Sequence, residues 1–359
     1  MISTATLAQA GKQQGAALLR FLAILILALL VFAIVLLVFG KNPIEAYVDI
    51  FTSTIGSSYG WSEVLVKVIP LVLCATAVLL PARIGLVNVG GEGQLYIGAL
   101  VASWGALAVA DVMPGFLGLP TIIILGFIGG GLWAAIPAVL RAMGWLNETI
   151  STLLLNYVAI LLVDYFVFGP LRDPSSANFP QSEPFPDAFR LPFLGSTRIH
   201  FGLIIATVVI AALYFVLNRT RWGYEMRAIG GNPNASRRHG MPISRYIIII
   251  MFIAGGLAGL AGMGETMAIQ GRLRPGFSPD YGYVGFLISW LAMHDPIGVV
   301  LMSFLIAIIA LGGDTLQITQ SMPFSSVNVL MSIILFIVLA KFSFGDIFKF
   351  FKKKEEATS

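Results

Sequence analysis

Residues 83–94 read Arg83-Ile84-Gly85-Leu86-Val87-Asn88-Val89-Gly90-Gly91-Glu92-Gly93-Gln94, a polar, glycine-rich interruption between two strongly apolar segments. No water is available inside a bilayer to satisfy freed backbone groups, so irregular backbone survives only where it is packed in protein or lines a watery cavity. Asn88, Glu92 and Gln94 lie within seven residues of this stretch, and polar groups inside a membrane span are costly and usually mark a pathway. The stretch therefore predicts a membrane transporter.

The composition also indicates a membrane protein. Of the 359 residues, 57% are hydrophobic and only 11% are charged, and the mean hydropathy is +0.89. A soluble globular protein has about 25% charged residues. The three histidines are scattered and the only cysteine is Cys74, so neither a metal site nor a disulfide is predicted. The basic residues punctuate apolar segments, which excludes a nucleic-acid-binding face.

The predicted fold is an all-α integral membrane protein, a single transmembrane domain over residues 1–359. A spanning helix needs about 20 mostly apolar residues. The third candidate span begins in the interruption, the eighth is short, and hydropathy leaves open whether the eighth and ninth are two spans or one bent hairpin. The ten candidates are residues 21–40, 63–82, 93–110, 121–140, 149–168, 201–217, 246–263, 283–293, 297–313 and 327–340.

The basic residues orient these spans. With a cytoplasmic N-terminus and ten spans, 15 of the 22 Lys and Arg residues fall in cytoplasmic segments, six fall outside, and Lys67 lies within a span. An excess of Lys and Arg marks the cytoplasmic loops of a membrane protein. Both termini are therefore predicted to be cytoplasmic, as tails of about residues 1–20 and 341–359. The longest external loop is about 169–198, and the longest cytoplasmic loop is about 218–245.

The cytoplasmic loop has the signals of a short helix. Gly230 and Gly231 end one element, Asn232 can cap the next, Pro233 suits a first helical position, and Gly240 suits the exit. These residues predict a helix over about 233–239. Anchoring to anionic lipid would account for the arginines of this loop, but it would not account for a capped helix between glycine stops.

Several motifs give the chain a family resemblance. Besides the interruption itself, these are Asn147-Glu148-Thr149-Ile150 with Leu155-Asn156-Tyr157, Gly223-Tyr224-Glu225-Met226-Arg227-Ala228-Ile229-Gly230 with Asn232-Pro233, Gly276-Phe277-Ser278-Pro279-Asp280-Tyr281-Gly282-Tyr283, and Pro296-Ile297-Gly298. With them the chain resembles, over about residues 43–341, the permease subunits of bacterial ABC importers for nucleosides and simple sugars. That family includes ribose-type and branched-chain amino acid relatives. The pattern Asn-x-Gly-x-Glu-Gly-Gln is closer to the nucleoside branch, whereas residues 237–239 and 293–295 depart from the family pattern.

The resemblance implies a set of partners in the bacterial plasma membrane. It implies a cytoplasmic ABC ATPase that binds ATP and Mg, a second, related permease chain forming a heterodimer, and an extracytoplasmic substrate-binding protein; membrane lipid surrounds the spans. The helix at 233–239 would be the coupling helix that docks on the ATPase. Its coupling residues would be Arg227, Asn232, Pro233, Ala235 and Gly240. This chain would then hold no cofactor and no catalytic residue, and no nucleophile–base or carboxylate pair appears in it.

Five polar residues are candidates for the solute path. A nucleoside needs hydrogen-bond donors and acceptors without a fixed opposite charge, and Asn88, Gln94, Asn156 and Tyr157 supply these, with Glu92 between the first two. Bonding to a neighbouring helix is the alternative for Asn156 and Tyr157. A sugar or branched-chain amino acid permease stays open as the function. So does an ion-coupled secondary transporter, in which Glu92 would be the coupling carboxylate.

Glycines predict two further features. Residues 85–94 and 276–285 are both glycine-rich, polar beginnings of a short apolar run, and five candidate spans lie on each side of the external loop. An odd number of spans per half forces opposite orientations, so two inverted five-helix halves with broken helices are expected. The pairs Gly126-xxx-Gly130 and Gly255-xxx-Gly259 have the spacing that lets membrane helices pack closely.

Overall fold

The computed structural model describes residues 26–110, 112–323, 325, 328–330 and 332–333. This part of the chain is helical and contains no strand beyond one isolated bridge between Phe193 and His200, which confirms the all-α prediction. The chain divides into two compact units, one formed by Ser58–Ala307 and the other by Met1–Ser57 with Ile308–Ser359.

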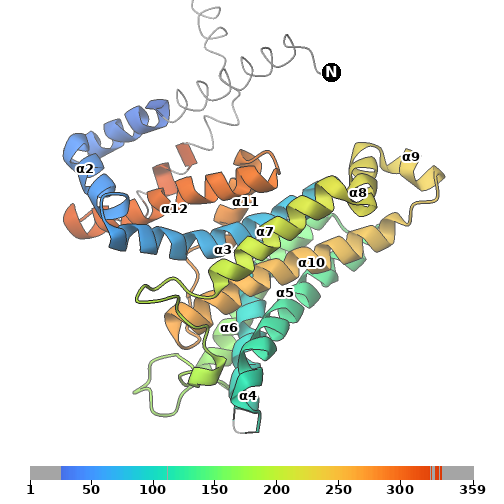
Figure 1. Ribbon diagram of the computed structural model, residues 1–359, viewed down its shortest axis with the longest axis horizontal. Coiled ribbons are helices and arrows are strands. Elements are labelled where there is room, and N and C mark those ends of the chain that lie inside the picture. The colour runs from blue at the N-terminus through green and yellow to red at the C-terminus, as the bar shows by residue number, and fades with distance from the viewer. Residues whose placement is uncertain (1–25, 111, 324, 326–327, 331, 334–359) are drawn as a thin grey trace, which may run out of the picture. The chain divides into compact units, whose positions relative to one another are not determined.

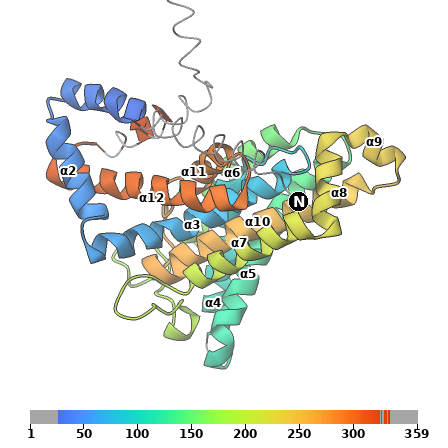
Figure 2. The ribbon, with the colours of Figure 1, turned by 45° about the horizontal axis from the view of Figure 1, so that its top comes forward.

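The larger unit is a bundle whose central helix is α10 (Figures 1 and 2). Its helices are α3 (Ser58–Ala82), α4 (Gly91–Val109), α5 (Gly118–Ala142), α6 (Glu148–Phe168), α7 (Gly202–Arg219), α8 (Arg221–Gly231), α9 (Pro233–Arg238), α10 (Ile243–Gly264), α11 (Tyr281–Leu291) and the first half of α12 (Pro296–Thr319). Short helical turns are η1 (Gly115–Leu117) and η2 (Asp187–Phe189), and the π-helix η3 (Glu265–Gln270) continues α10.

Helix α10 contacts α3, α4 and α5, and its interface with α5 is lined by glycine. A Cβ atom on Gly130 of α5 would lie 2.2 Å from the Gly255 carbonyl oxygen, and one on Gly259 would lie 2.2 Å from that of Gly126. Neither position has room for a side chain, so the two backbones touch directly. The prediction that these two glycine pairs serve helix packing is confirmed.

Helices α4 and α11 pack reciprocally. Helix α4, which follows α3 in the chain, packs against α10, whereas α11, which follows α10, packs against α3. Helices α3 and α10 also pack against each other, through Ala77, Ala254 and Ala258. The helix that begins at each glycine-rich polar stretch thus lies against the long helix that precedes the other stretch.

The count of ten spans is not confirmed. Within the described residues six helices are long and apolar enough to cross a membrane, or seven with a bent pair at Ile26–Val38 and Pro43–Thr54. Helix α4 corresponds to the third candidate span but is not among the six, because its first turn is polar, and α11 is short. Helices α11 and α12 are separate helices, and of the two only α12 is long enough to cross a membrane. The tenth candidate, 327–340, lies almost wholly outside the described residues, as do the tails 1–20 and 341–359.

The smaller unit contains the bent pair and the second half of α12. Its two helices, Ile26–Val38 and α2 (Pro43–Thr54), meet at an angle of 117°. Asn42 caps α2 by accepting from the Ile44 amide, and Pro43 occupies the first position, where its missing N–H costs nothing. Helix α2 binds α12 through a hydrogen bond of 2.8 Å between the hydroxyls of Thr315 and Ser53.

Candidate functional site

The interruption begins where α3 ends. Gly85 has a φ of +79°, the left-handed conformation that glycine adopts without steric cost. The Gly85 amide donates to the carbonyl of Ala82 and the Leu86 amide donates to that of Pro81, the bond pair of a Schellman cap. Residues 86–89 have no regular secondary structure, and the chain enters α4 at Gly91. The broken backbone predicted from the sequence is present.

Asn88 replaces a backbone hydrogen bond that α3 cannot form. In a regular helix the carbonyl of Ala77 would accept from the amide of residue 81, but this residue is Pro81 and has no N–H. The Asn88 side-chain amide donates to that carbonyl at 3.0 Å and to the Gln94 Oε1 atom at 3.0 Å. Its Oδ1 atom accepts from Gln94 Nε2 and from the Gly90 amide, each at 3.0 Å. All four hydrogen-bonding positions of this buried amide are filled from within the chain.

Helix α6 holds the other side of the interruption. The Asn156 Oδ1 atom accepts from the Gly93 amide at 2.8 Å, and its Nδ2 atom donates to the Val89 carbonyl at 2.9 Å. The Thr152 hydroxyl, one turn earlier, accepts from the Val89 amide at 3.2 Å. Residues four apart share one helix face, so a single polar stripe of α6 satisfies the broken backbone.

Glu92 joins the beginnings of α4 and α11. Its Oε2 atom accepts from the Gly282 amide in the first turn of α11 at 2.6 Å. A carboxylate is favoured at a helix N-terminus, where amides are unpaired and the helix dipole is positive. A Cβ on Gly282 would lie only 2.1 Å from the Glu92 amide nitrogen, so the two helix ends are in backbone contact.

The structure brings together four of the five predicted path residues. Asn88, Glu92, Gln94 and Asn156 have exposed fractions of 0–1%, and the hydrogen bonds described above join each to the chain itself. Tyr157 lies apart from this cluster on the outer face of α6, with an exposed fraction of 59%. The clustered residues therefore close the interruption in this conformation.

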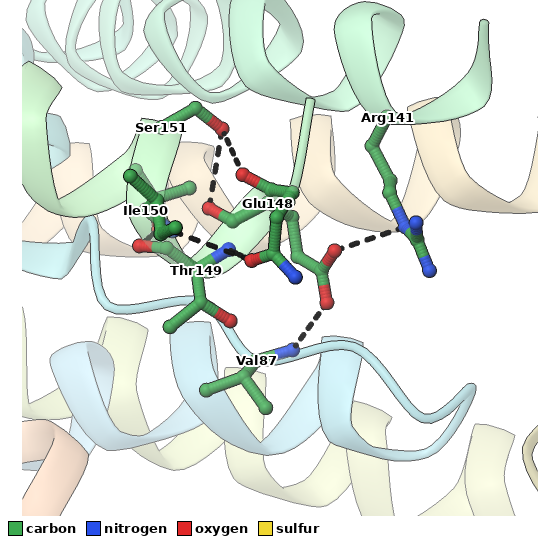
Figure 3. Close-up of polar contacts among 8 residues, drawn as sticks. Val87, Arg141, Glu148, Thr149, Ile150 and Ser151 are labelled. Carbon is green, nitrogen blue, oxygen red and sulfur yellow. Dashed lines mark hydrogen bonds and ion pairs between the residues drawn. The ribbon is translucent and has the colours of Figure 1, made fainter. Parts of the chain in front are cut away.

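Glu148 is a further member of the site that the sequence analysis did not select (Figure 3). It lies at the start of α6, where Asn147 caps the helix. Its Oε1 atom accepts from the Val87 amide at 3.4 Å, and its Oε2 atom forms an ion pair with Arg141 Nε at 2.9 Å. The side chain is 7% exposed, whereas that of Arg141 is 42% exposed. The only sequence signal was the motif Asn147-Glu148, which by itself indicates a helix start.

Changing Glu148 should separate its two contacts. Glu148→Ala removes both and leaves the Val87 amide without its acceptor, so we expect a loss of about 2 kcal/mol in stability. Glu148→Gln keeps an amide oxygen for Val87 and loses only the ion pair with the part-exposed Arg141, which is worth about 1 kcal/mol or less. Thermal unfolding of the purified protein would measure both. Equal losses for the two variants would contradict the assigned bond to Val87.

The short helix predicted over residues 233–239 is present as α9, one residue shorter than expected. The Asn232 Oδ1 atom accepts from the Ala235 amide at 3.0 Å and Pro233 is the first helical residue. Gly240 has a φ of +79°, and the Met241 amide donates to the Ser236 carbonyl at 3.1 Å, a second Schellman-type exit. In both Figure 1 and Figure 2, α8 and α9 lie at the end of the larger unit where α10 begins.

Helix α8 is fixed to the bundle by polar contacts. Arg227 donates to the carbonyl of Leu217 in α7, and the Tyr246 hydroxyl of α10 donates to the Glu225 carboxylate. Arg221 also pairs with Glu225 at 2.8 Å. The hydrogen bond from Tyr246, followed by that from Arg221, holds the pKa of the Glu225 carboxyl below its usual value. Glu225 is thus charged at neutral pH and joins α8 to α10.

Comparison with known proteins shows similarity to one family of transport proteins. The family described as branched-chain amino acid transport system / permease component matches residues 60–340. The glucose ABC transporter permease protein of Haloferax volcanii is 35% identical over 88% of this chain and 85% of its own. The guanosine ABC transporter permease protein of Bacillus subtilis is 30% identical (92% and 95%), and the nucleoside ABC transporter permease protein NupB of Lactococcus lactis is 30% identical (86% and 87%). No solved structure matches the chain significantly.

Proposed function

The chain belongs to the permease family of ABC transport systems, and we propose from this premise that it forms the path of an ATP-driven importer for a nucleoside. ATP hydrolysis takes place in a separate ABC ATPase. A second, related permease chain and an extracytoplasmic substrate-binding protein complete the transporter in the bacterial plasma membrane. The observation that carries the proposal is helix α9. It is capped at both ends by its own neighbouring residues, Asn232 and Gly240, and it lies at the end of the bundle.

The nucleoside assignment rests on two kinds of support. Two of the three relatives described above are permeases for guanosine or nucleosides. The interruption also contains neutral amides, which would bind a sugar and a base once their present hydrogen bonds exchange. The glucose permease of Haloferax volcanii favours a simple sugar as the second candidate. A branched-chain amino acid is the third candidate, and the description of the matching family supports it.

The membrane arrangement belongs to the same proposal. We expect ten spans in two inverted halves, with both termini cytoplasmic, and the reciprocal packing of α4 on α10 and of α11 on α3 supports this arrangement. The end that carries Arg83, α8 and α9 would face the cytoplasm. The interruption then lies toward the inner end of the path. Because Asn88, Glu92, Gln94 and Asn156 are bonded to one another and to the backbone, a solute would reach them only after these bonds exchange; Tyr157 would face the path from outside this cluster.

Uptake of labelled solutes tests the proposed substrate class. The complete complex is placed in proteoliposomes with ATP inside the compartment that corresponds to the cytoplasm. Labelled guanosine is supplied with an excess of unlabelled nucleoside, glucose or leucine. We expect unlabelled nucleosides to abolish the signal and the other two to leave it unchanged. Uptake of labelled glucose in a parallel measurement, with no uptake of labelled guanosine, would assign the sugar class instead.

The coupling role predicts a selective defect in α9. Asn232→Ala removes the cap of a six-residue helix and costs about 1 kcal/mol of helix stability. Ala235→Glu places a bulky charge on its exposed surface. We expect both variants to lose most ATP-dependent uptake while the binding protein still binds solute with unchanged affinity. The matched control is Ser244→Ala, an exposed position in the first turn of α10. Normal uptake by Ala235→Glu would contradict docking of the ATPase at α9.

A further inference from the structure

Arg83 lies in the turn after α3, at a point where three separate segments of the larger unit converge. Its guanidinium donates from Nη2 to the carbonyl of His294, in the turn between α11 and α12, at 2.6 Å. Asp295 is its acidic neighbour, and Arg227 of α8 is its basic neighbour. Arg83 therefore lies close to both α8 and the α11–α12 turn.

The contact between this turn and α8 is made by backbone. A Cβ on Gly230, three residues before α9 begins, would lie 2.4 Å from the Arg83 carbonyl oxygen. On the other side, a Cβ on Gly85 would lie 3.8 Å from the Gly230 carbonyl oxygen. With no side chain between them, a displacement of the end of α8 moves the turn that carries Arg83, because packed interiors transmit such displacements and do not absorb them.

The α11–α12 turn that accepts from Arg83 has a strained backbone. Met293 and His294 have φ values of 52° and 57°, a left-handed conformation that is unfavourable for residues with a side chain. The His294 ring contacts Trp290, and its Nδ1 atom lies 3.0 Å from the Ser289 hydroxyl. Asp295 caps α12. Strained residues persist where neighbouring contacts hold them, and they are found in switch regions.

Arg83 is only partly satisfied in this conformation. Its Nε atom is buried and has no hydrogen-bond partner among the described residues, and a like charge, Arg227, lies near it. Arg227 itself is held by the carbonyl of Leu217. A buried donor without a partner needs an explanation, and a guanidinium with five donors can change partners when the surrounding segments move.

We propose that Arg83 is a positioning residue that transmits movement of the α8–α9 loop to the α11–α12 turn. Its backbone contacts Gly230 on the α8 side, and its guanidinium holds the His294 carbonyl on the other side. Helix α11 leads from that turn to Gly282, which is bound by Glu92 at the start of α4. Movement at α9 thereby reaches the two helix N-termini that meet at the interruption. The proposal rests on the importer function proposed above.

The test measures uptake per ATP hydrolysed by the complete complex in proteoliposomes. In Arg83→Ala we expect ATP hydrolysis to continue while uptake falls about tenfold, since a charged hydrogen bond of this kind is lost. Arg83→Lys, which keeps the charge but only a point donor, should recover part of the ratio. The control is Arg245→Ala, which removes an exposed arginine near the beginning of α10, and its ratio should match the wild type. Uptake and hydrolysis falling together, or an unchanged ratio, would overturn the proposal.

Two further results distinguish a failure of the importer function from a failure of the role proposed for Arg83. If the wild-type complex shows no ATP-dependent uptake, the proposed importer function is wrong, whatever the variants do. If Arg83→Ala does not assemble, the ratio of uptake to ATP hydrolysis is measured in Asp295→Asn instead. The new asparagine still caps α12, but it has no charge to attract the Arg83 guanidinium. A lowered ratio of uptake to hydrolysis in Asp295→Asn supports the role of Arg83, and an unchanged ratio in both Asp295→Asn and Arg83→Lys rejects it.

Discussion

Replacing Gly282 by alanine should abolish transport. The added Cβ would lie 2.1 Å from the amide nitrogen of Glu92 and 2.4 Å from its Cα atom, distances at which no real Cβ is found. The obstructing atoms are backbone, so no rotamer change can relieve the overlap, and we expect a cost of about 3 kcal/mol or more. The helix end must shift, and the bond from Gly282 to the Glu92 carboxylate is lost with it.

The matched control for Gly282→Ala is Gly264→Ala. Gly264 ends α10, and its Cβ would meet only the His200 ring at 3.6 Å, an ordinary van der Waals distance. Alanine is favoured over glycine in a helix by about 1 kcal/mol, so the control should be neutral or slightly stabilising. Initial uptake rates and thermal unfolding of the two variants give the comparison. Wild-type uptake by Gly282→Ala would show that α4 and α11 do not meet as described.

Asn88→Leu should destabilise the protein, because the irregular backbone of residues 83–94 loses the side chain that binds it to α3 and α4. Leucine branches at the same atom as asparagine but can neither donate nor accept a hydrogen bond, so the substitution removes all four bonds of the side chain. It leaves the carbonyl of Ala77, the side chain of Gln94 and the amide of Gly90 without partners. Each buried group without a partner costs about 1–3 kcal/mol, so we expect a total loss of roughly 3 kcal/mol or more.

The comparison of stability with uptake decides what Asn88 does. If Asn88 holds the broken backbone together, Asn88→Leu should lower both the thermal stability of the protein and its uptake rate. If Asn88 only contacts the solute, Asn88→Leu should lower the uptake rate and leave the thermal stability unchanged. We expect the first result, and the second would return Asn88 to the role of a solute-binding group. Asn218→Leu, at an exposed position near the end of α7, is the control for the loss of an amide and should change neither quantity.

Features encoded by neighbouring residues were predictable from the sequence. Helix α9 follows from Asn232, Pro233 and Gly240, because capping acts within one turn. The broken backbone at Gly85 follows from local chemistry for the same reason. The packing of Gly126-xxx-Gly130 on Gly255-xxx-Gly259 needed only a spacing rule for each helix, although their pairing with each other was not foreseen.

Features that depend on distant partners were not predictable. Glu92 and Gly282 are 190 residues apart, and nothing near either one in the chain indicates the other as its partner. Asn88 reaches the carbonyl left open by Pro81, which is apparent only once α3 is known to be continuous up to that residue. Consecutive residues of a helix point about 100° apart, so Asn156 faces the cluster whereas Tyr157 is exposed.

The driving force for transport distinguishes an ATP-driven importer from an ion-coupled transporter. Uptake of the labelled solute is measured with the complete complex under ATP alone, under a proton or sodium gradient alone, and with neither, and again with this chain purified by itself. The account predicts uptake with the complete complex and ATP, and none in any other condition. Uptake by the isolated chain under an ion gradient would contradict it, and would make Glu92 a coupling carboxylate in place of the link between α4 and α11.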